Sequence, residues 1–341
     1  MSGAGSDVRG CDVLLFANTD WYLYNFRRSL AEAIRARGQS VLLVSPDGPC
    51  GPKLRELGFR WEPIAMERRS LRPDAELRVI GQLITLLRRE RPRLLHNFTI
   101  KCAVYGSIAA RFADVPGCVN AIAGLGYVFT NDDWRARVLA PTVRLLMRLS
   151  LGGERSRLIV QNPDDERQFR ALGFSEGLSV IPGSGVDCRR FMPRKGARAG
   201  RKRVLFCGRV LWDKGIAEFV AAARQLASPD LEFAIAGTSD PGNPAAVPLE
   251  TIQEWVKAGW LNWLGHVDDM PGLLVETDLF VLPSYREGLP KSLIEAAACA
   301  LPLVATDVPG CRDVIRHEVD GLLVQVRDEQ ALASAIARLA G

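Results

Sequence analysis

Short apolar runs alternate with helical patterns along the first half of the chain. The runs predict strands at 13–17, 41–44, 94–97, 118–122 and 158–160. One of the helices between them is expected to begin at Asp74 and to bury an apolar stripe of Leu77, Ile80, Ile84 and Leu87. This alternation predicts a parallel, doubly wound α/β sheet that ends with 158–160 and binds ligands at the carboxyl ends of its strands.

The second half of the chain restarts the same alternation. Strands are predicted at 204–207, 233–236, 261–264, 279–282, 303–305 and 322–324, and a last helix at 329–339. Between the halves, 193–202 is basic, rich in glycine and without an apolar period, as is typical of a linker. We therefore predict a Rossmann-like domain at 1–188, a linker at 189–202, a second Rossmann-like domain at 203–341, and a ligand cleft between the domains.

Composition narrows the function only slightly. The 341 residues suit two domains, and a net charge of +5 does not call for nucleic acid as a partner. The 8 cysteines are scattered and none forms Cys-x-x-Cys, which favours a reducing, cytoplasmic location. We expect neither a signal peptide nor a membrane span, because 1–10 has no apolar core and no uncharged apolar run is long enough.

The segment 135–157 differs from its surroundings because it is basic and amphipathic. It interleaves leucine and valine with Arg135, Arg137, Arg144, Arg148, Arg155 and Arg157. A basic amphipathic helix can lie on an anionic membrane surface, which would make the protein a peripheral membrane protein. It can equally pack on its own domain with a solvated arginine face, and Pro141 can interrupt it.

The stretch from 279 to 307 carries two acidic residues around the start of a helix. A buried strand leads into a loop with Glu287, and the helix that follows carries Glu295. Pro290 suits the first helical turn, so the amides around Leu289 and Lys291 can bind an anion. Glu295 could be an ordinary exposed helix residue. Its apolar neighbours favour a binding role, because an unpaired charge among them would be costly.

A second polar loop follows the strand predicted at 204–207. Gly208, Arg209 and Lys214 place a guanidinium and an ammonium at the mouth of the second sheet, although a solvated helix start is the alternative. Arginine binds phosphate oxygens in a bidentate way, and lysine acts as a point charge. No Asp-x-Asp occurs, and the three histidines are too far apart in sequence to suggest a metal site.

Four motifs of the second half occur together. They are Gly208-Arg209-x4-Lys214-Gly215, Gly265-His266-Val267, the run 283–296 with its Glu-x7-Glu spacing, and the run 305–312. Together they resemble glycosyltransferase family 4, which consists of retaining enzymes with the GT-B fold, and the resemblance covers nearly the whole chain. The runs 67–71, 95–101 and 124–126 resemble, more loosely, the bacterial branch that extends polyprenyl-diphosphate-linked sugars.

The resemblance implies how the second domain would bind a nucleotide-sugar, expected to be a UDP-sugar. Arg209, Lys214 and Glu287 would be the catalytic residues. The two cations would bind the donor diphosphate and stabilise the leaving group. Glu287 would bind the transferred sugar and would not act as a glycosidase nucleophile, and Glu295 would bind the ribose. The other donor-binding residues would be Gly208, Gly265, His266, Val267, Gly288, Leu289, Pro290 and Lys291. No metal or other cofactor is implied.

The looser resemblance implies a polyprenyl-diphosphate-linked acceptor at the cytoplasmic face of the membrane. The product would belong to a bacterial surface glycan. Candidates for binding the acceptor diphosphate are Arg68, Arg69 and Lys101. The other acceptor-binding candidates are Asp20, Tyr22, His96, Gly124 and Gly126. A transferase with a soluble acceptor and a catalytically silent scaffold in a glycan-assembly complex remain alternatives.

The sequence departs from the family pattern in three places. The run 19–22 stands where many members have a glycine-rich loop, and 121–124 lacks a histidine that many members carry. The resemblance therefore supplies no histidine-assisted step, and His96 is only a weak substitute. The chain also ends just after the 329–339 helix, whereas members usually continue into a helix that crosses back to the first domain. On that basis, closure of the domains can be impaired.

Overall fold

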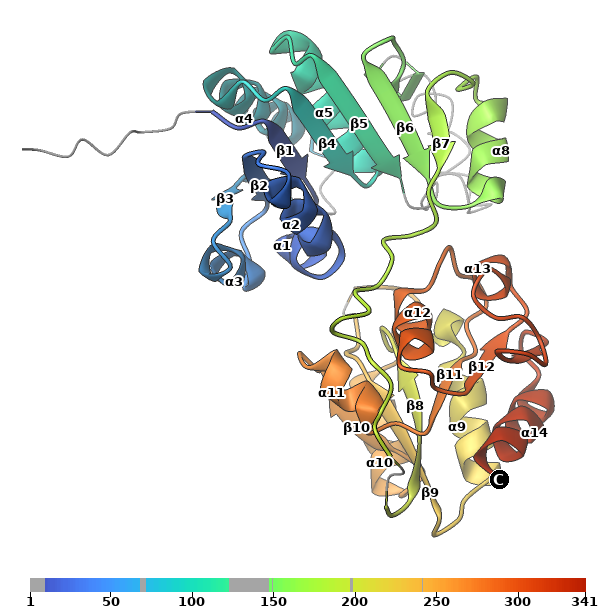
Figure 1. The fold of residues 1–341 in the computed structure, drawn as a ribbon. Helices are drawn as coiled ribbons and strands as arrows, with labels where there is room; N and C mark the ends of the chain where they lie inside the picture. The colour runs from blue at the N-terminus through green and yellow to red at the C-terminus, as the bar shows by residue number, and fades with distance from the viewer. Residues whose placement is uncertain (1–9, 68–71, 123–146, 149, 197–198, 241) are drawn as a thin grey trace, which may run out of the picture. The chain divides into compact units, whose positions relative to one another are not determined.

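The computed structural model describes residues 10–67, 72–122, 147–148, 150–196, 199–240 and 242–341. The chain divides into two compact units, Met1–Ser184 and Gly185–Gly341 (Figure 1). The first unit holds a sheet of seven strands and the second a sheet of six. Every strand pairing in both sheets is parallel, which confirms the predicted α/β architecture.

In the first unit the strands have the order β3-β2-β1-β4-β5-β6-β7. Its elements in chain order are β1 (Val13–Phe16), α1 (Asp20–Tyr22), the π-helix η1 (Leu23–Arg27), α2 (Arg28–Ala36), β2 (Val41–Ser45), α3 (Cys50–Glu56), β3 (Arg60–Pro63), α4 (Pro73–Glu90), β4 (Leu94–Phe98), α5 (Ile100–Phe112), β5 (Gly117–Ile122), β6 (Ser156–Val160), α8 (Pro163–Ala171) and β7 (Leu178–Val180).

Alternate residues of β1 face two different cores. Leu14 and Phe16 lie in a cluster with the apolar side chains of α4 and α5, whereas Val13 and Leu15 lie in a cluster with those of α2 and α3. Successive side chains of a strand point to opposite faces, so helices on both faces bury the whole strand. This explains why β1 reads as a continuous apolar run rather than as an alternating one.

Two expectations for this unit need correction. Of the stripe predicted on α4, Leu87 is buried as expected, but Leu77 is 69% exposed, and the buried face carries Val79 and Leu83 instead. That face also carries Glu90, so its sequence pattern does not look apolar. The buried Glu90 carboxylate pairs with Arg60 at 2.8 Å. Strand β6 is not the last strand, since the short β7 pairs with it at the sheet edge. The three residues of β7 are too few, and too exposed, to give a clear apolar signal.

The second unit repeats the order of the first six strands of the first unit, as β10-β9-β8-β11-β12-β13. Its elements in chain order are β8 (Lys202–Cys207), the 3-10 helix η2 (Trp212–Lys214), α9 (Ile216–Gln225), β9 (Leu231–Ala236), α10 (Leu249–Lys257), β10 (Asn262–Gly265), α11 (Met270–Val275), β11 (Leu279–Leu282), α12 (Lys291–Ala298), β12 (Leu303–Thr306), α13 (Pro309–Arg312), β13 (Gly321–Val324) and α14 (Glu329–Ala340).

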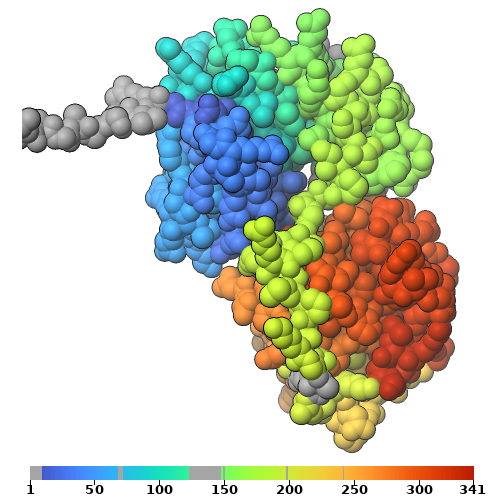
Figure 2. Space-filling model, in the orientation of Figure 1, coloured from blue at the N-terminus to red at the C-terminus, as the bar shows by residue number. Residues whose placement is uncertain are grey.

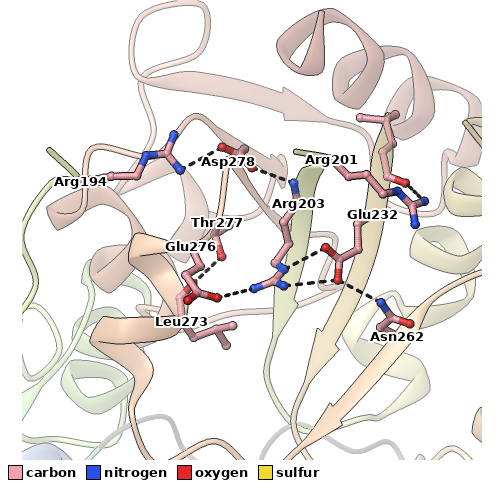
Figure 3. Close-up of polar contacts among 10 residues, drawn as sticks. Arg194, Arg201, Arg203, Glu232, Asn262, Leu273, Glu276, Thr277 and Asp278 are labelled. Atoms are coloured by element: carbon pink, nitrogen blue, oxygen red, sulfur yellow. Dashed lines mark hydrogen bonds and ion pairs between the residues drawn. The ribbon is translucent and has the colours of Figure 1, made fainter. Parts of the chain in front are cut away.

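The chain that enters the second unit is fixed to it before β8 begins. Phe191 is buried in the core of this unit, and the Arg194 guanidinium donates to the Asp278 carboxylate at 3.0 Å. Asp278 also accepts the amide of Arg203, the second residue of β8 (Figure 3). In the space-filling view, 185–196 lies along the surface of the second unit (Figure 2). The first part of the segment predicted as a linker is therefore built into this unit.

Both sheets have a switch point, where the order of strands reverses. It lies between β1 and β4 in the first unit and between β8 and β11 in the second. The loops after these strands diverge to opposite faces of the sheet, which leaves a crevice at the carboxyl ends where ligands bind in such folds. The residues after these four strands are therefore the first places to look for a site.

Candidate active site

The switch point of the second unit brings together two predicted site residues. Lys214 ends η2, after β8, and Glu287 lies in the loop after β11. The Lys214 Nζ atom is 2.6 Å from the Glu287 Oε1 atom, and the two side chains are only 20% and 11% exposed. An ammonium and a carboxylate that lie 73 positions apart in sequence therefore form one partly buried ion pair.

Backbone contacts between the two loops hold this pair in place. Gly215 has φ 72°, and a Cβ atom there would lie 2.0 Å from the Pro283 carbonyl oxygen. The Tyr285 amide donates to the Asp213 carbonyl at 2.9 Å. Glycine is needed at 215 both for its left-handed conformation and for the close approach of the neighbouring backbone.

The loop before α12 is packed just as tightly. Gly288 and Leu289 precede Pro290, which is the N-cap of α12 rather than a residue of its first turn. A Cβ atom at Gly310 would lie 2.2 Å from the Gly288 carbonyl oxygen, so the start of α13 presses on this loop. No side chain caps α12. Its first amides have no partners within the helix, as an anion-binding helix start requires.

Glu295 is buried and paired. Its side chain is 8% exposed, and the Lys291 Nζ atom lies 2.8 Å from its Oε1 atom, one helical turn earlier. The pairing explains how a carboxylate is accommodated among the apolar neighbours noted in the sequence. The structure thus gives each predicted site glutamate a lysine partner, Lys214 for Glu287 and Lys291 for Glu295.

The remaining donor candidates lie around this centre in different surroundings. Arg209 is 52% exposed and pairs with Asp240 at 2.9 Å, so it has a different carboxylate partner from Lys214. Gly208 follows β8 and its backbone packs tightly against Gly237, where a Cβ atom would lie 1.8 Å from the Gly208 carbonyl oxygen. Gly265 has φ 63°. His266 is exposed with Asp268 at 3.4 Å, and Val267 packs against the core.

Two thiols lie beneath the site and are held neutral. Burial, with a smaller contribution from the charge of Glu295, raises the pKa of Cys207 to about 12. Burial and the charge of Glu287 likewise raise the pKa of Cys311 to about 12. A thiol is nucleophilic only as a thiolate, so neither cysteine is suited to covalent chemistry at neutral pH.

The sequence reading missed a support for the Glu287 loop. The Tyr285 hydroxyl donates to the Glu218 carboxylate at 2.6 Å, and the Arg327 guanidinium lies 4.7 Å from the Tyr285 ring. Burial and this hydrogen bond raise the pKa of Tyr285 to about 12, so the hydroxyl stays a donor. The sequence contained one indication of this contact, because Glu218 is an acidic residue on the otherwise apolar face of α9.

Two acceptor candidates of the first unit are bound by the fold. Asp20 is 4% exposed, and its carboxylate accepts the amides of Cys50 and Gly51 at 2.6 and 2.8 Å, at the start of α3. Lys101 pairs with Glu76 at 2.9 Å and donates to a backbone carbonyl at 2.7 Å. The described contacts of Asp20 are therefore structural, and its role in acceptor binding stays a prediction. Lys101 already has a carboxylate partner.

Tyr22 and His96 lie against the same ring, that of Phe98. The ring centroids are 5.9 Å apart for Tyr22 and 4.3 Å apart for His96. Burial, with a smaller contribution from the charge of Arg27, lowers the pKa of His96 to about 3, so its imidazole is neutral at physiological pH. The last acceptor candidates, Arg68, Arg69, Gly124 and Gly126, lie outside the described residues.

The basic segment 135–157 lies largely outside the described residues, among them Arg135, Arg137 and Arg144. Where it is described, Arg148 donates from Nε to the Leu172 carbonyl at 2.6 Å. No helix in the described part of the chain is long and apolar enough to cross a membrane. Binding of this segment to a membrane surface stays a prediction.

Comparison with known proteins assigns the class. The family described as "Glycosyl transferase 4-like" matches residues 12–162, and the family described as "Glycosyl transferases group 1" matches residues 201–341. The first match covers the β1–β6 region and the second covers the second sheet with the Lys214–Glu287 pair. The chain belongs to glycosyltransferase family 4 and is a glycosyltransferase with the GT-B fold.

Individual relatives agree with this class. The chain is 29% identical over 330 residues to the N,N'-diacetylbacillosaminyl-diphospho-undecaprenol alpha-1,3-N-acetylgalactosaminyltransferase of Campylobacter jejuni, covering 93% of this chain and 86% of that protein. It is also 29% identical over 280 residues to an Escherichia coli UDP-Gal:alpha-D-GlcNAc-diphosphoundecaprenol alpha-1,3-galactosyltransferase, covering 77% of this chain and 70% of that one.

Solved structures share the fold. The chain matches Anabaena HepE in complex with UDP and glucose with a TM-score of 0.76 and 18% identity, over 96% of this chain and 89% of that one. It also matches WaaG, a glycosyltransferase involved in lipopolysaccharide biosynthesis, with a TM-score of 0.71 and 15% identity, over 96% and 90%. At these identities the likeness concerns the fold alone.

Proposed function

We propose that this glycosyltransferase moves a hexose or N-acetylhexosamine from a UDP-sugar to an undecaprenyl-diphosphate-linked saccharide, with retention of configuration and without a metal. The observation that carries the donor half is the Lys214–Glu287 pair at the switch point of the second sheet, with buried Glu295 nearby on α12. The acceptor half is supported by two relatives whose names specify undecaprenol-diphosphate-linked acceptors.

The charges of the site suit a nucleotide diphosphate donor. In the free protein Lys214 neutralises Glu287 and Lys291 neutralises Glu295. A diphosphate would compete for the two ammonium groups, because a doubly charged group attracts a cation more strongly than one carboxylate does. Each glutamate could then accept hydrogen bonds from hydroxyls, Glu287 from the transferred sugar and Glu295 from the ribose.

The reaction proposed for this site breaks the bond between the sugar C1 atom and the diphosphate oxygen. The acceptor hydroxyl forms its bond to C1 on the same face, and the departing phosphate oxygen takes the hydroxyl proton. Negative charge grows on the diphosphate as the bond breaks, so Lys214 and Arg209 act where charge develops. Glu287 pairs with Lys214 in the free protein and orients the sugar, so no covalent sugar–enzyme step is assigned to it.

The test is a panel of UDP-sugars with undecaprenyl-diphosphate-linked sugars, read as release of UDP and as mass of the lipid product. We expect release of UDP with one donor to depend on the lipid-linked acceptor, and the new glycosidic bond to keep the donor's anomeric configuration. Transfer to a water-soluble sugar alone would favour a soluble acceptor. Failure of the protein to bind any nucleotide would favour a catalytically silent scaffold.

A further inference from the structure

The switch point of the first unit holds an arginine that none of the family motifs includes. Arg27 ends the π-helix η1, which follows β1, and its guanidinium lies 4.3 Å from the ring of Phe98, the last residue of β4. The Tyr22 hydroxyl accepts a hydrogen bond from Arg27 at 2.8 Å. π-Helical turns are rare in proteins, and those that occur are often found at functional sites.

The described contacts of Arg27 include no counterion for its charge. Among the described residues, no carboxylate lies within ion-pair distance of it, whereas the adjacent Arg28 pairs with Glu32 at 3.3 Å. The Nε atom of Arg27 is buried and has no hydrogen-bond partner in the described part of the structure. A guanidinium whose Nε atom is buried, with a stacking ring and a neutral hydroxyl but no anion among the described residues, is suited to receive an anion from outside.

A second unsatisfied group lies beside the same ring. The Nε2 atom of His96 is buried without a partner among the described residues, and its ring lies 4.3 Å from that of Phe98, as the Arg27 guanidinium does. A neutral imidazole can donate one hydrogen bond to a phosphate oxygen. Two buried nitrogen atoms from different elements therefore adjoin one aromatic ring and have no hydrogen-bond partner in the described part of the chain.

The helix that follows β4 begins at the same switch point. Helix α5 starts at Ile100, and the side chain of its N-cap residue makes no capping hydrogen bond in the described structure. Its N-cap residue, Thr99, has φ 77° and ψ 156°, a conformation that β-branched residues rarely adopt. Such strain persists where the surrounding structure imposes it, often at ligand sites. The strained turn here begins a helix at the switch point, where an anion is favoured.

We propose that Arg27, with His96 and the N-terminus of α5, binds the diphosphate group of the acceptor. This assignment rests on the proposed function and replaces Lys101, whose ammonium already pairs with Glu76, as the described cation at that diphosphate. Arginine suits this task because its planar fork contacts two phosphate oxygens at once. Arg27 is thus a binding residue for the part of the acceptor that does not react.

The test compares two probes by calorimetric titration of the full-length chain saturated with UDP. One probe is a farnesyl-diphosphate-linked N-acetylhexosamine, and the other carries the same sugar on farnesol without phosphate. We expect Arg27→Gln to weaken binding of the diphosphate probe about tenfold or more and to leave the phosphate-free probe unchanged. The matched control is Arg37→Gln, an exposed arginine at the end of α2, which should bind both probes like wild type.

Equal weakening of both probes, or no weakening of either, would overturn the assignment. Where Arg27→Gln does not fold, Arg27→Lys carries the test, since lysine keeps the charge but loses the bidentate contact. Wild-type affinity of Arg27→Lys for the diphosphate probe would then contradict the proposal. The proposed function fails separately, if the wild-type protein binds the diphosphate probe through Arg27 but releases no UDP with any donor.

Discussion

The two units share one strand order but arrange charge differently at their switch points. In the second unit, Lys214 and Glu287 neutralise each other beside the paired Lys291 and Glu295. In the first unit, the described switch-point side chains offer Arg27 and neutral His96, and the acidic Asp20 is taken up by backbone amides. One site therefore holds two neutralised ion pairs, whereas Arg27 in the other has no carboxylate partner among the described residues.

This difference matches the chemistry of the two proposed ligands. A nucleotide-sugar carries a diphosphate, a ribose and a hexose, so its site needs cations for phosphate and carboxylates for hydroxyls. The lipid-linked diphosphate of an acceptor needs a cation and has no nearby ribose. Under the proposed function, the same scaffold becomes a donor site or an acceptor site according to which side chains follow the two central strands.

The largest effect is expected from removing the cation of the donor site. Lys214→Ala should lower the rate of UDP release with lipid-linked acceptor about 10²–10³-fold, because a fixed charge at the leaving group is lost. The matched control is Lys257→Ala, which removes an exposed lysine at the end of α10 and should be neutral. Unchanged turnover in Lys214→Ala would remove the donor site from the second switch point.

A smaller effect is expected from forcing the two donor loops apart. Gly215→Ala should lower the free energy of unfolding by about 2–3 kcal/mol, since the new methyl meets a backbone oxygen in a left-handed turn. Gly259→Ala is a close control, because Gly259 has nearly the same φ, 71°, and an added Cβ atom there meets nothing within 4 Å. It should cost about 1 kcal/mol. Thermal unfolding of both variants measures the difference, and equal losses would show that the loops are not in close contact.

The pH dependence of stability tests the first switch point. The pKa of His96 falls from 6.5 to about 3 on folding. Between these two pH values the unfolded chain therefore binds a proton at His96 that the folded chain does not bind. The stabilisation is complete above pH 6.5 and is lost as pH falls toward 3, by up to about 1.4 kcal/mol per pH unit. Urea unfolding across this range should show a shallower loss for His96→Gln than for wild type. Parallel curves for the two proteins would mean that His96 titrates normally.

Much of the fold followed from the sequence because parallel strands buried on both faces read as continuous apolar runs. The grouping of Lys214 with Glu287 was also predictable, since each residue lies in the segment that follows such a run. Contacts between polar groups that lie far apart in the sequence could not be predicted. Asp20 reads as an exposed loop acid until α3 brings the amides of Cys50 and Gly51 to it.

The role of Arg27 and the buried face of α4 were not predicted from the sequence for a related reason. In a chain with 44 basic residues, one more arginine carries no signal until its neighbours are known. Only the fold shows that Arg27 lacks a carboxylate partner among the described residues, while Arg28 beside it has one. The apolar face of α4 was hard to recognise in the sequence because it includes the charged Glu90. Its partner Arg60 lies far away in sequence, on strand β3.

In the proposed function, the second unit binds the nucleotide of the donor through Glu295 and the first unit does not. Calorimetric titration of UDP into the wild-type protein, Glu295→Gln and Arg27→Gln separates these two roles. We predict that Glu295→Gln weakens UDP binding about tenfold, as expected when a charged hydrogen-bond acceptor is lost, and that Arg27→Gln binds UDP like wild type. Wild-type affinity in Glu295→Gln, or weakened affinity in Arg27→Gln, would contradict the division of labour between the two switch points.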